Sequence, residues 1–175
     1  MQTFILHEDM EISAGRLDSR RCFKQAVECK QIYLAINKES AGWQNHPAVL
    51  QWKNDTQELL SYGWICLTDC INYKAYKLQS WYAQYLVQPL AFEFPPRLHK
   101  LIPYHQSLML RKDYHYYKTI FPGIQSTGWA RYLDENDRVF HIKFGKKIYD
   151  PRLLKAFCLA CLISRAISTT NCKTL

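Results

Sequence analysis

Residues 17–36, LDSRRCFKQAVECKQIYLAI, form the segment that most restricts how this chain can fold. Apolar residues recur there at steps of four and three, which is the period of an α-helix with one buried face. We therefore predict a long amphipathic helix around which the rest of the chain is organised. Its buried stripe is expected to contain Cys22, Ala26, Cys29, Tyr33 and Ile36, widened by Phe23, Val27 and Leu34.

The other side of this predicted helix carries Arg21, Lys24, Gln25 and Glu28. Arg21 and Glu28 lie nearly in line, about two helical turns from one another. Two interpretations are open. In the first, this is a solvated face with a Lys24–Glu28 ion pair, as most charged helix faces are. In the second, cations, an amide and a carboxylate are gathered for chemistry on a polyanion.

The composition describes a globular, basic protein of 175 residues, with 48% hydrophobic and 14% aromatic residues. A chain of this length can bury one real core, with room for an appendage. The formal net charge of +8 and the pI near 9.1 favour a polyanionic partner. Nucleic acid is the expected partner, and a membrane surface is not, because no segment combines a basic face with a continuous apolar one.

The seven cysteines predict reduced thiols rather than a disulfide framework. Their number is odd, their spacing is irregular, and MQTFILHEDM lacks the features of a signal peptide, so we expect a cytoplasmic protein. The pairs Cys66/Cys70 and Cys158/Cys161 have spacings that zinc ligands can use. Both pairs lie in apolar helical sequence, where cysteine usually packs in the core, so we expect no metal and no cofactor.

The order of segments predicts a mainly α protein. MQTFILH at 1–7 is either a strand or an extended arm against the core, and Ser13 or Asp18 caps the long helix. Pro47 begins a second helix with His46 or Asn45 as its cap. Asp55 and Glu58 form a capping box for a third helical segment through Ile71, or the second helix continues through them. Further helices are expected at 78–87 and, as one helix, from Pro103 to Phe121.

After Gly123 the pattern changes to the alternation of apolar and polar residues that is typical of β-strands. Segments 129–133 and 138–144 predict a β-hairpin with DEND as its turn, and an apolar helix is expected to follow Asp150 and Pro151. We therefore predict a compact helical domain at 1–123 and a β-hairpin plus helix extension at 124–175. This extension is a candidate surface for oligomer formation.

Four segments in order resemble one protein family. They are MQTF, LDSRRCFKQAVECKQI, GWQNHPAVLQW and HQSLMLRKDYHYYKTIFPG. Together they resemble the endonuclease V–like family of pyrimidine-dimer DNA glycosylases, and most closely its phage and bacterial relatives with segments of the type RLxKQxVE, NHPAVxxW and HxSxxLRK. The resemblance covers residues 1–123 with a divergent insert at 72–96, and residues 124–175 have no recognised counterpart.

This resemblance implies a mainly helical DNA glycosylase, often with abasic-site lyase activity, that acts on double-stranded DNA carrying a damaged or modified pyrimidine. The family uses the α-amine of the chain as nucleophile at the sugar C1′, assisted by a glutamate on the first long helix. Here the resemblance assigns these roles to Met1 and Glu28. The resemblance implies Arg21 and Lys24 as phosphate-binding residues. We also expect Gln25, His46, His105, Arg111 and Lys112 to bind DNA; the last four match motif positions of the phage and bacterial relatives, but the resemblance gives them no role.

The residue types fit such chemistry. An α-amine has a pKa of roughly 7.7–8.0, so a useful fraction is neutral at pH 7 and can form an imine without special burial. Residue 2 is Gln, which is too bulky for ready removal of the initiator Met, so Met1 is expected to remain. The alternative is a non-catalytic module of phage type that binds nucleic acid, a nucleotide or a protein, for example in counter-defence.

Several of these residues also have a structural interpretation. His46 can be a helix cap, and His105 can be an interior histidine. Trp43 and Trp52 are expected to be core anchors. Tyr114, Tyr116 and Tyr117 can stack on bases, although packing is the simpler role.

Overall fold

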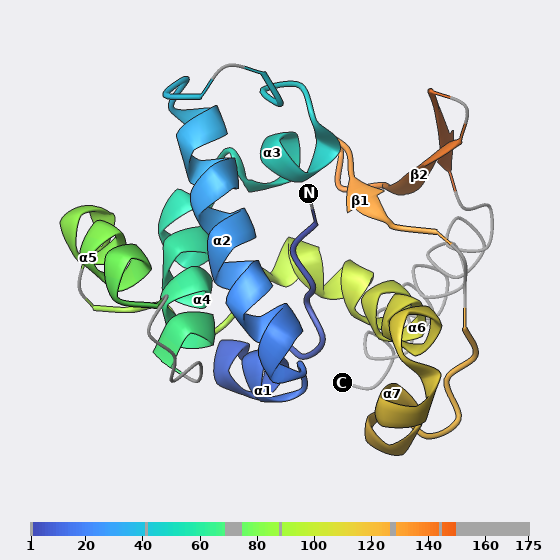
Figure 1. Cartoon of the computed structure of the whole chain (residues 1–175). Helices are drawn as coiled ribbons and strands as arrows, with labels where there is room; N and C mark the ends of the chain where they lie inside the picture. The colour runs from blue at the N-terminus through green and yellow to red at the C-terminus, as the bar shows by residue number, and fades with distance from the viewer. Residues whose placement is uncertain are drawn as a thin grey trace, which may run out of the picture.

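The computed structural model describes residues 2–40, 42–68, 75–87, 89–126, 129–143 and 145–149. Helices dominate this part of the chain, and a small antiparallel sheet follows them (Figure 1). The helices are α1 (Met10–Gly15), α2 (Ser19–Ile36), α3 (Pro47–Trp52), α4 (Thr56–Thr68), α5 (Ala75–Tyr85), the 3-10 helix η1 (Pro96–Leu101), α6 (Ile102–Lys112) and α7 (Tyr114–Ile120). The strands are β1 (Tyr132–Leu133), β2 (Val139–Lys143) and β3 (Lys146–Tyr149). The predicted mainly α class is confirmed.

Helix α2 forms where the sequence predicts the organising helix. Asp18 is its cap, because its side chain accepts a hydrogen bond from the backbone N–H of Arg21 at 3.1 Å. Ser13 instead lies inside α1, a short helix that the prediction did not separate. The predicted faces of α2 are partly wrong, since Gln25 and Glu28 are buried rather than solvated. The buried residues of α2 are Cys22, Gln25, Ala26, Glu28, Cys29, Ile32 and Ala35.

Residues 2–7 form the expected extended arm, which runs between α2 and α6 without joining a sheet (Figure 1). A buried extended segment must still satisfy its backbone groups. Here side chains of the surrounding helices do so, and the arm is thereby held in one position. The bonds run from Phe4 N to Gln25 Oε1 (2.6 Å), from Ile5 N to His105 Nδ1 (3.0 Å), from Leu6 N to Ser13 Oγ (2.9 Å) and from the Tyr62 hydroxyl to Phe4 O (2.7 Å).

Helix α4 approaches α2 closely because Gly63 has no side chain. A Cβ atom at Gly63 would lie 2.0 Å from the Tyr82 hydroxyl oxygen and 2.9 Å from Cys29 Cβ. The Tyr82 hydroxyl in turn donates to the Ala26 carbonyl at 2.7 Å, which ties α5 to α2 across the same contact. Leu59, Leu60 and Leu67 of α4 are buried, while Cys70 and Ile71, at the end of the helix predicted here, fall outside the described residues.

The prediction of a single helix from Pro103 to Phe121 is wrong, because the helix is interrupted at Asp113. This residue has extended backbone angles, φ −157° and ψ 92°, and ends α6. Its side chain then accepts the backbone N–H of Tyr116 at 3.2 Å and so caps α7. Helix α7 consequently takes its own direction. The predicted opening of the first helix at Pro103 is confirmed.

The predicted β-hairpin is confirmed in β1 and β2, which pair antiparallel across the turn at 134–137. Strand β3, which the sequence did not predict, extends the sheet in the order β1-β2-β3. Strand β1 packs against α3, and the N–H of Leu133 donates to Gln51 Oε1 at 3.2 Å. The helix expected after Asp150 lies outside the described residues, so the proposed division at 124 stays a prediction.

Candidate functional site

The start of the chain and Glu28 of α2 meet at one point. The backbone N–H of Gln2 donates to Glu28 Oε2 at 2.8 Å. The other carboxylate oxygen lies 3.5 Å from Lys24 Nζ, and the Glu28 residue keeps 7% of its surface exposed. Met1 lies outside the described residues. The carboxylate, which the helical period places opposite the predicted buried stripe, therefore points at the first residues of the arm.

Gln25 holds the arm in register with this carboxylate. Its Oε1 accepts the Phe4 N–H at 2.6 Å, and its Nε2 donates to the Gln2 carbonyl at 3.0 Å. The buried Gln25 amide thus makes the backbone hydrogen bonds that a neighbouring β-strand would otherwise make to the arm. These two bonds fix the position of the arm along α2, and so the N–H of Gln2 faces Glu28. Gln25 is 1% exposed, so in this structure it acts on the arm rather than at the surface.

His105 of α6 holds the other side of the arm as a neutral ring. Its Nδ1 accepts the N–H of Ile5 at 3.0 Å, so the ring proton is on Nε2. The Nε2 proton faces the Arg131 carbonyl oxygen at 3.3 Å, and the terminal amide of Gln2 lies 3.0 Å from Nε2. Complete burial lowers the pKa of His105 to about 4, which keeps the ring neutral near pH 7.

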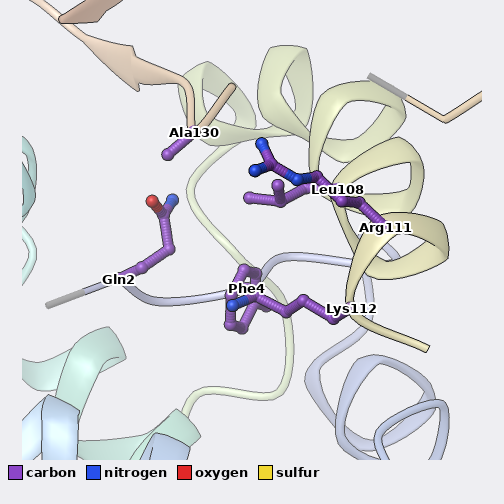
Figure 2. A pocket seen from close by; sticks show the side chains of 6 residues that line it. All are labelled: Gln2, Phe4, Leu108, Arg111, Lys112 and Ala130. Carbon is purple, nitrogen blue, oxygen red and sulfur yellow. The ribbon is translucent and has the colours of Figure 1, made fainter. Parts of the chain in front are cut away.

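A basic pocket of about 350 Å³ opens beside Gln2 and Phe4. Figure 2 shows Arg111 and Lys112 of α6 facing these two arm residues, with the Lys112 ammonium 5.4 Å from the centre of the Phe4 ring. The remaining lining residues are Leu108 and Ala130.

Several charged side chains lie near Lys112 at this pocket. Partial burial lowers the pKa of Lys112. The positive charges of Arg21, Lys24 and Arg111 lower it further, while the negative charge of Glu28 acts in the opposite direction. Lys112 therefore lies within the electrostatic reach of three other cationic side chains and of one carboxylate. Such an arrangement suits a ligand that brings several negative charges of its own.

Arg21 links α2 to the end of α6 and to α7. Its guanidinium donates to Asp18 at 2.5 Å and to the Lys112 carbonyl at 3.1 Å, and it lies over the Tyr117 ring. Burial acts to raise the pKa of Asp18, but hydrogen bonds from Arg21 and Tyr117 outweigh it and hold that pKa below its ordinary value. Arg21 therefore has a structural role, although about a quarter of its side chain, 24%, remains exposed.

The NHP segment lies on the other side of the chain start. His46 caps α3, as predicted, because its Nδ1 accepts the Ala48 N–H at 3.1 Å, and burial lowers its pKa. Its ring contacts Tyr132 of β1 edge-to-face at 5.8 Å. The pKa of Tyr132 is raised by burial and then by the negative charge of Glu28. Helix α3 is also tied to the arm, since Trp52 Nε1 donates to Thr3 Oγ1 at 2.8 Å.

The structure thus brings most of the predicted residues into one neighbourhood, but in different ways. Lys24, Arg111 and Lys112 are exposed cations, whereas Gln25 and His105 reach the chain start from within the core. The sequence missed two contributors. Gln2 supplies the N–H that meets Glu28, and Tyr132 comes from a strand with no motif to mark it.

The aromatic predictions have mixed outcomes. Trp52 is fully buried, as expected of a core anchor, but Trp43 is 60% exposed and the same prediction for it is wrong. Tyr117 is buried, while Tyr114 and Tyr116 are largely exposed. These three tyrosines therefore differ in burial although they are close neighbours in the sequence.

The described residues contain no group of three or more His, Cys, Asp or Glu side chains that could hold a metal ion. Cys22, Cys29 and Cys66 are buried in the core as reduced cysteines, and the Cys22 thiol donates to the Cys66 carbonyl at 3.2 Å. Within the same residues, no helix has both the length and the apolar character needed to cross a membrane.

Comparison with known proteins gives one match. A family model described as pyrimidine dimer DNA glycosylase matches residues 1–80, which include the arm, α2 with Glu28, and the NHP segment. No curated protein and no solved structure matches the chain significantly. The match supports the resemblance seen in the first segments of the sequence.

Proposed function

On the premise that this chain belongs, through residues 1–80, to the pyrimidine dimer DNA glycosylase family, we propose that it removes a damaged or modified pyrimidine from double-stranded DNA. In this proposal the α-amine at the chain start is the nucleophile and Glu28 transfers protons. An abasic-site lyase step follows on the same amine.

The hydrogen bond between Gln2 and Glu28 carries this proposal. The peptide nitrogen of Gln2 lies 2.8 Å from the carboxylate. Covalent geometry keeps the amine of Met1 within about 4 Å of that nitrogen, whatever the conformation of Met1. If Met1 is removed, the Gln2 nitrogen itself becomes the α-amine. In both cases the amine is confined to the immediate surroundings of Glu28.

These groups can perform the chemistry in order. The neutral amine attacks C1′, a nitrogen–carbon bond forms, and the base leaves with a proton as its bond to C1′ breaks. Glu28 accepts the proton that the amine loses and returns it to O4′ when the sugar ring opens, while solvent supplies the proton that the departing base takes up. The nitrogen lone pair then opens the sugar ring to give a cationic imine, which the carboxylate stabilises. Loss of a proton from C2′ expels the 3′ phosphate, which is the lyase step.

In this proposal the cationic side chains of the site bind the DNA phosphates. Lys24, Arg111 and Lys112 are exposed. Lys24 pairs with Glu28, and Arg111 and Lys112 line the pocket beside Gln2, where phosphates on either side of the lesion can reach them. Arg21 is partly exposed beside them. Gln25 and His105 are proposed to support binding indirectly, by fixing the arm, and His46 by placing the NHP segment beside it.

Trapping with borohydride tests the proposal. A duplex with a true abasic site is incubated with the protein and sodium borohydride, which reduces the imine to a stable amine. We expect a covalent adduct that peptide mapping places on the N-terminal residue, and N-terminal acetylation should abolish it. The intact mass of the protein identifies which residue comes first. A protein with a free N-terminus that forms no adduct and releases no base would disprove the glycosylase mechanism.

The same hydrogen bond supports a second candidate, a DNA-binding module without chemistry. With Met1 in place, the nitrogen nearest Glu28 is a peptide nitrogen, and a peptide nitrogen is not nucleophilic. This candidate predicts salt-sensitive binding to DNA with neither adduct nor base release, so the trapping experiment separates the two.

A further inference from the structure

Trp43 is held outside the core by its backbone. Its side chain is 60% exposed, although tryptophan usually buries most of its surface. Its φ is +63°, in the left-handed region that bulky residues rarely occupy, and it follows Gly42 at +89°. The N–H of His46 donates to the Trp43 carbonyl at 2.8 Å, which closes the turn that presents the ring. Such strain at an exposed aromatic residue points to a role in function.

The ring stands at the edge of the candidate site. It contacts the His46 ring edge-to-face at 5.4 Å, and His46 contacts Tyr132 in the same way. The charge of Glu28 in turn acts on Tyr132. The bond from Trp52 to Thr3 anchors α3, directly after this turn, to the arm. Ring contacts thus connect Trp43 through His46 to Tyr132, and the Trp52–Thr3 hydrogen bond connects α3 to the arm.

The surroundings of the ring are polar and open to a ligand. Residues 42–47 line a pocket of about 460 Å³, in which the side chains of Gln44 and Asn45 are exposed amides. An aromatic face beside amide donors and acceptors matches a nucleobase, which has a flat π-face and a hydrogen-bonding edge. A lipid surface fits less well, because the ring has amides rather than apolar side chains beside it.

We propose that Trp43 stacks on an unpaired nucleobase, one that is exposed when the duplex opens at the lesion. This inference rests on the proposed function and deepens it, because an enzyme that reaches a base in a duplex leaves bases without their stacking partners. The stacking residue would replace the lost neighbour. The basic groups around Glu28 would hold the adjoining phosphates.

Binding to a non-reactive DNA tests this role. The probe is a duplex with one tetrahydrofuran abasic analogue, which cannot form an imine, and 2-aminopurine as the opposite base. We expect the wild-type protein to quench the 2-aminopurine fluorescence. Trp43→Ala should weaken binding about 5- to 100-fold and remove the quenching. Trp43→Phe should retain most of the affinity, because a ring remains.

Two comparisons make the result specific. Tyr76→Ala removes another exposed aromatic side chain, on α5, and should bind like the wild type. A fully paired duplex should bind Trp43→Ala and the wild type almost equally. The inference is overturned if Trp43→Ala binds the abasic duplex as tightly as the wild type, or if it weakens both duplexes equally. If the borohydride adduct still forms in that case, the glycosylase proposal is kept and only the stacking role of Trp43 is rejected. If the wild-type protein binds neither duplex, both proposals are rejected.

Discussion

The backbone N–H of Gln2 lies 2.8 Å from Glu28 Oε2, although the two residues are 26 positions apart in the sequence. This contact joins the arm to the middle of α2 and gives a glutamate that is only 7% exposed a defined partner. A buried carboxylate needs such hydrogen bonds. Because the partner is the second residue of the chain, the contact also confines the chain start to the neighbourhood of the carboxylate and its surrounding cations.

Replacing Glu28 by Gln is expected to lower turnover about 10²- to 10⁴-fold, the usual contribution of a general acid–base group. The amide can still accept the Gln2 N–H, so the arm stays in place and DNA affinity should change only a few-fold. Single-turnover base release and fluorescence anisotropy measure the two quantities.

Glu39→Gln is the matched control, since Glu39 is an exposed glutamate just beyond the end of α2. It should behave like the wild type in both assays. If Glu28→Gln releases the base at the wild-type rate, the assignment of Glu28 as the proton-transfer group is wrong.

The double variant Arg111→Ala, Lys112→Ala should bind DNA more weakly and with less dependence on salt. Each phosphate contact contributes about 0.9 to the slope of log K against log salt, so losing two lowers the slope by about 1.8. Affinity measured across a salt series gives the slope. Lys77→Ala, at an exposed lysine of α5, should leave it unchanged. An unaltered slope in the double variant would place the phosphate contacts elsewhere.

Gln25→Leu should lower the free energy of unfolding by about 2–4 kcal/mol, because it leaves Phe4 N and the Gln2 carbonyl without partners in a buried setting. It should also lower the rate of imine trapping, since the arm is no longer held in register. Urea unfolding and borohydride trapping measure these effects. Gln31→Leu, at an exposed position of the same helix, is the control and should change neither. Equal stability of the two variants would show that Gln25 does not hold the arm.

The sequence was a good guide to the helices whose signals are local. Asp18 and His46 cap the helices predicted for them, and the Gly123 turn and the hairpin lie where expected. The break at Asp113 was missed because the apolar period continues through it, whereas the chain follows the cap that the Asp113 side chain forms. Local propensity does not decide between continuing a helix and capping a new one.

The site was predictable only in part, because its key contacts join distant segments. The helical wheel placed Gln25 and Glu28 among solvated charges, and nothing in 17–36 reveals that an extended arm lies against that side. The motifs grouped the right residues through resemblance, but burial decides their roles. His105, for example, has no exposed surface and binds Ile5 and Gln2, a role that its neighbours in sequence do not indicate.

Acid should destabilise the protein through His105. Burial holds its pKa at about 4, below the value near 6.5 of an unfolded chain. The unfolded state therefore binds an extra proton between these two values, and stability falls as the pH is lowered from about 6.5 to about 4. Below that the loss is complete, at about 3 kcal/mol for this one group. Urea unfolding at a series of pH values measures the curve.

His105→Gln should be less stable at pH 7 but should lack this slope, because the amide does not titrate. His115→Gln removes an exposed histidine of α7 and should retain the wild-type slope. The pKa values of Asp18 and Asp134 lie below the ordinary range of a carboxyl group. Their contributions to the free energy of unfolding are therefore lost at a lower pH than that of His105, so the two effects can be told apart. A His105→Gln variant with the full wild-type slope would mean that another group is responsible.

Trp43→Gly should stabilise the folded protein while it weakens DNA binding. Glycine adopts a φ of +63° freely, so the substitution removes the backbone strain and should raise the free energy of unfolding by about 1 kcal/mol, after the extra entropy of the unfolded glycine is subtracted. Little packing is lost, because the side chain is mostly exposed. Tyr76→Gly is the matched control, since Tyr76 is also exposed but lies in α5, where glycine is less favourable than tyrosine by roughly 0.5 kcal/mol. Thermal unfolding of the two variants should therefore shift in opposite directions. If both shift downward alike, Trp43 is not strained, and its outward position has to be explained by packing.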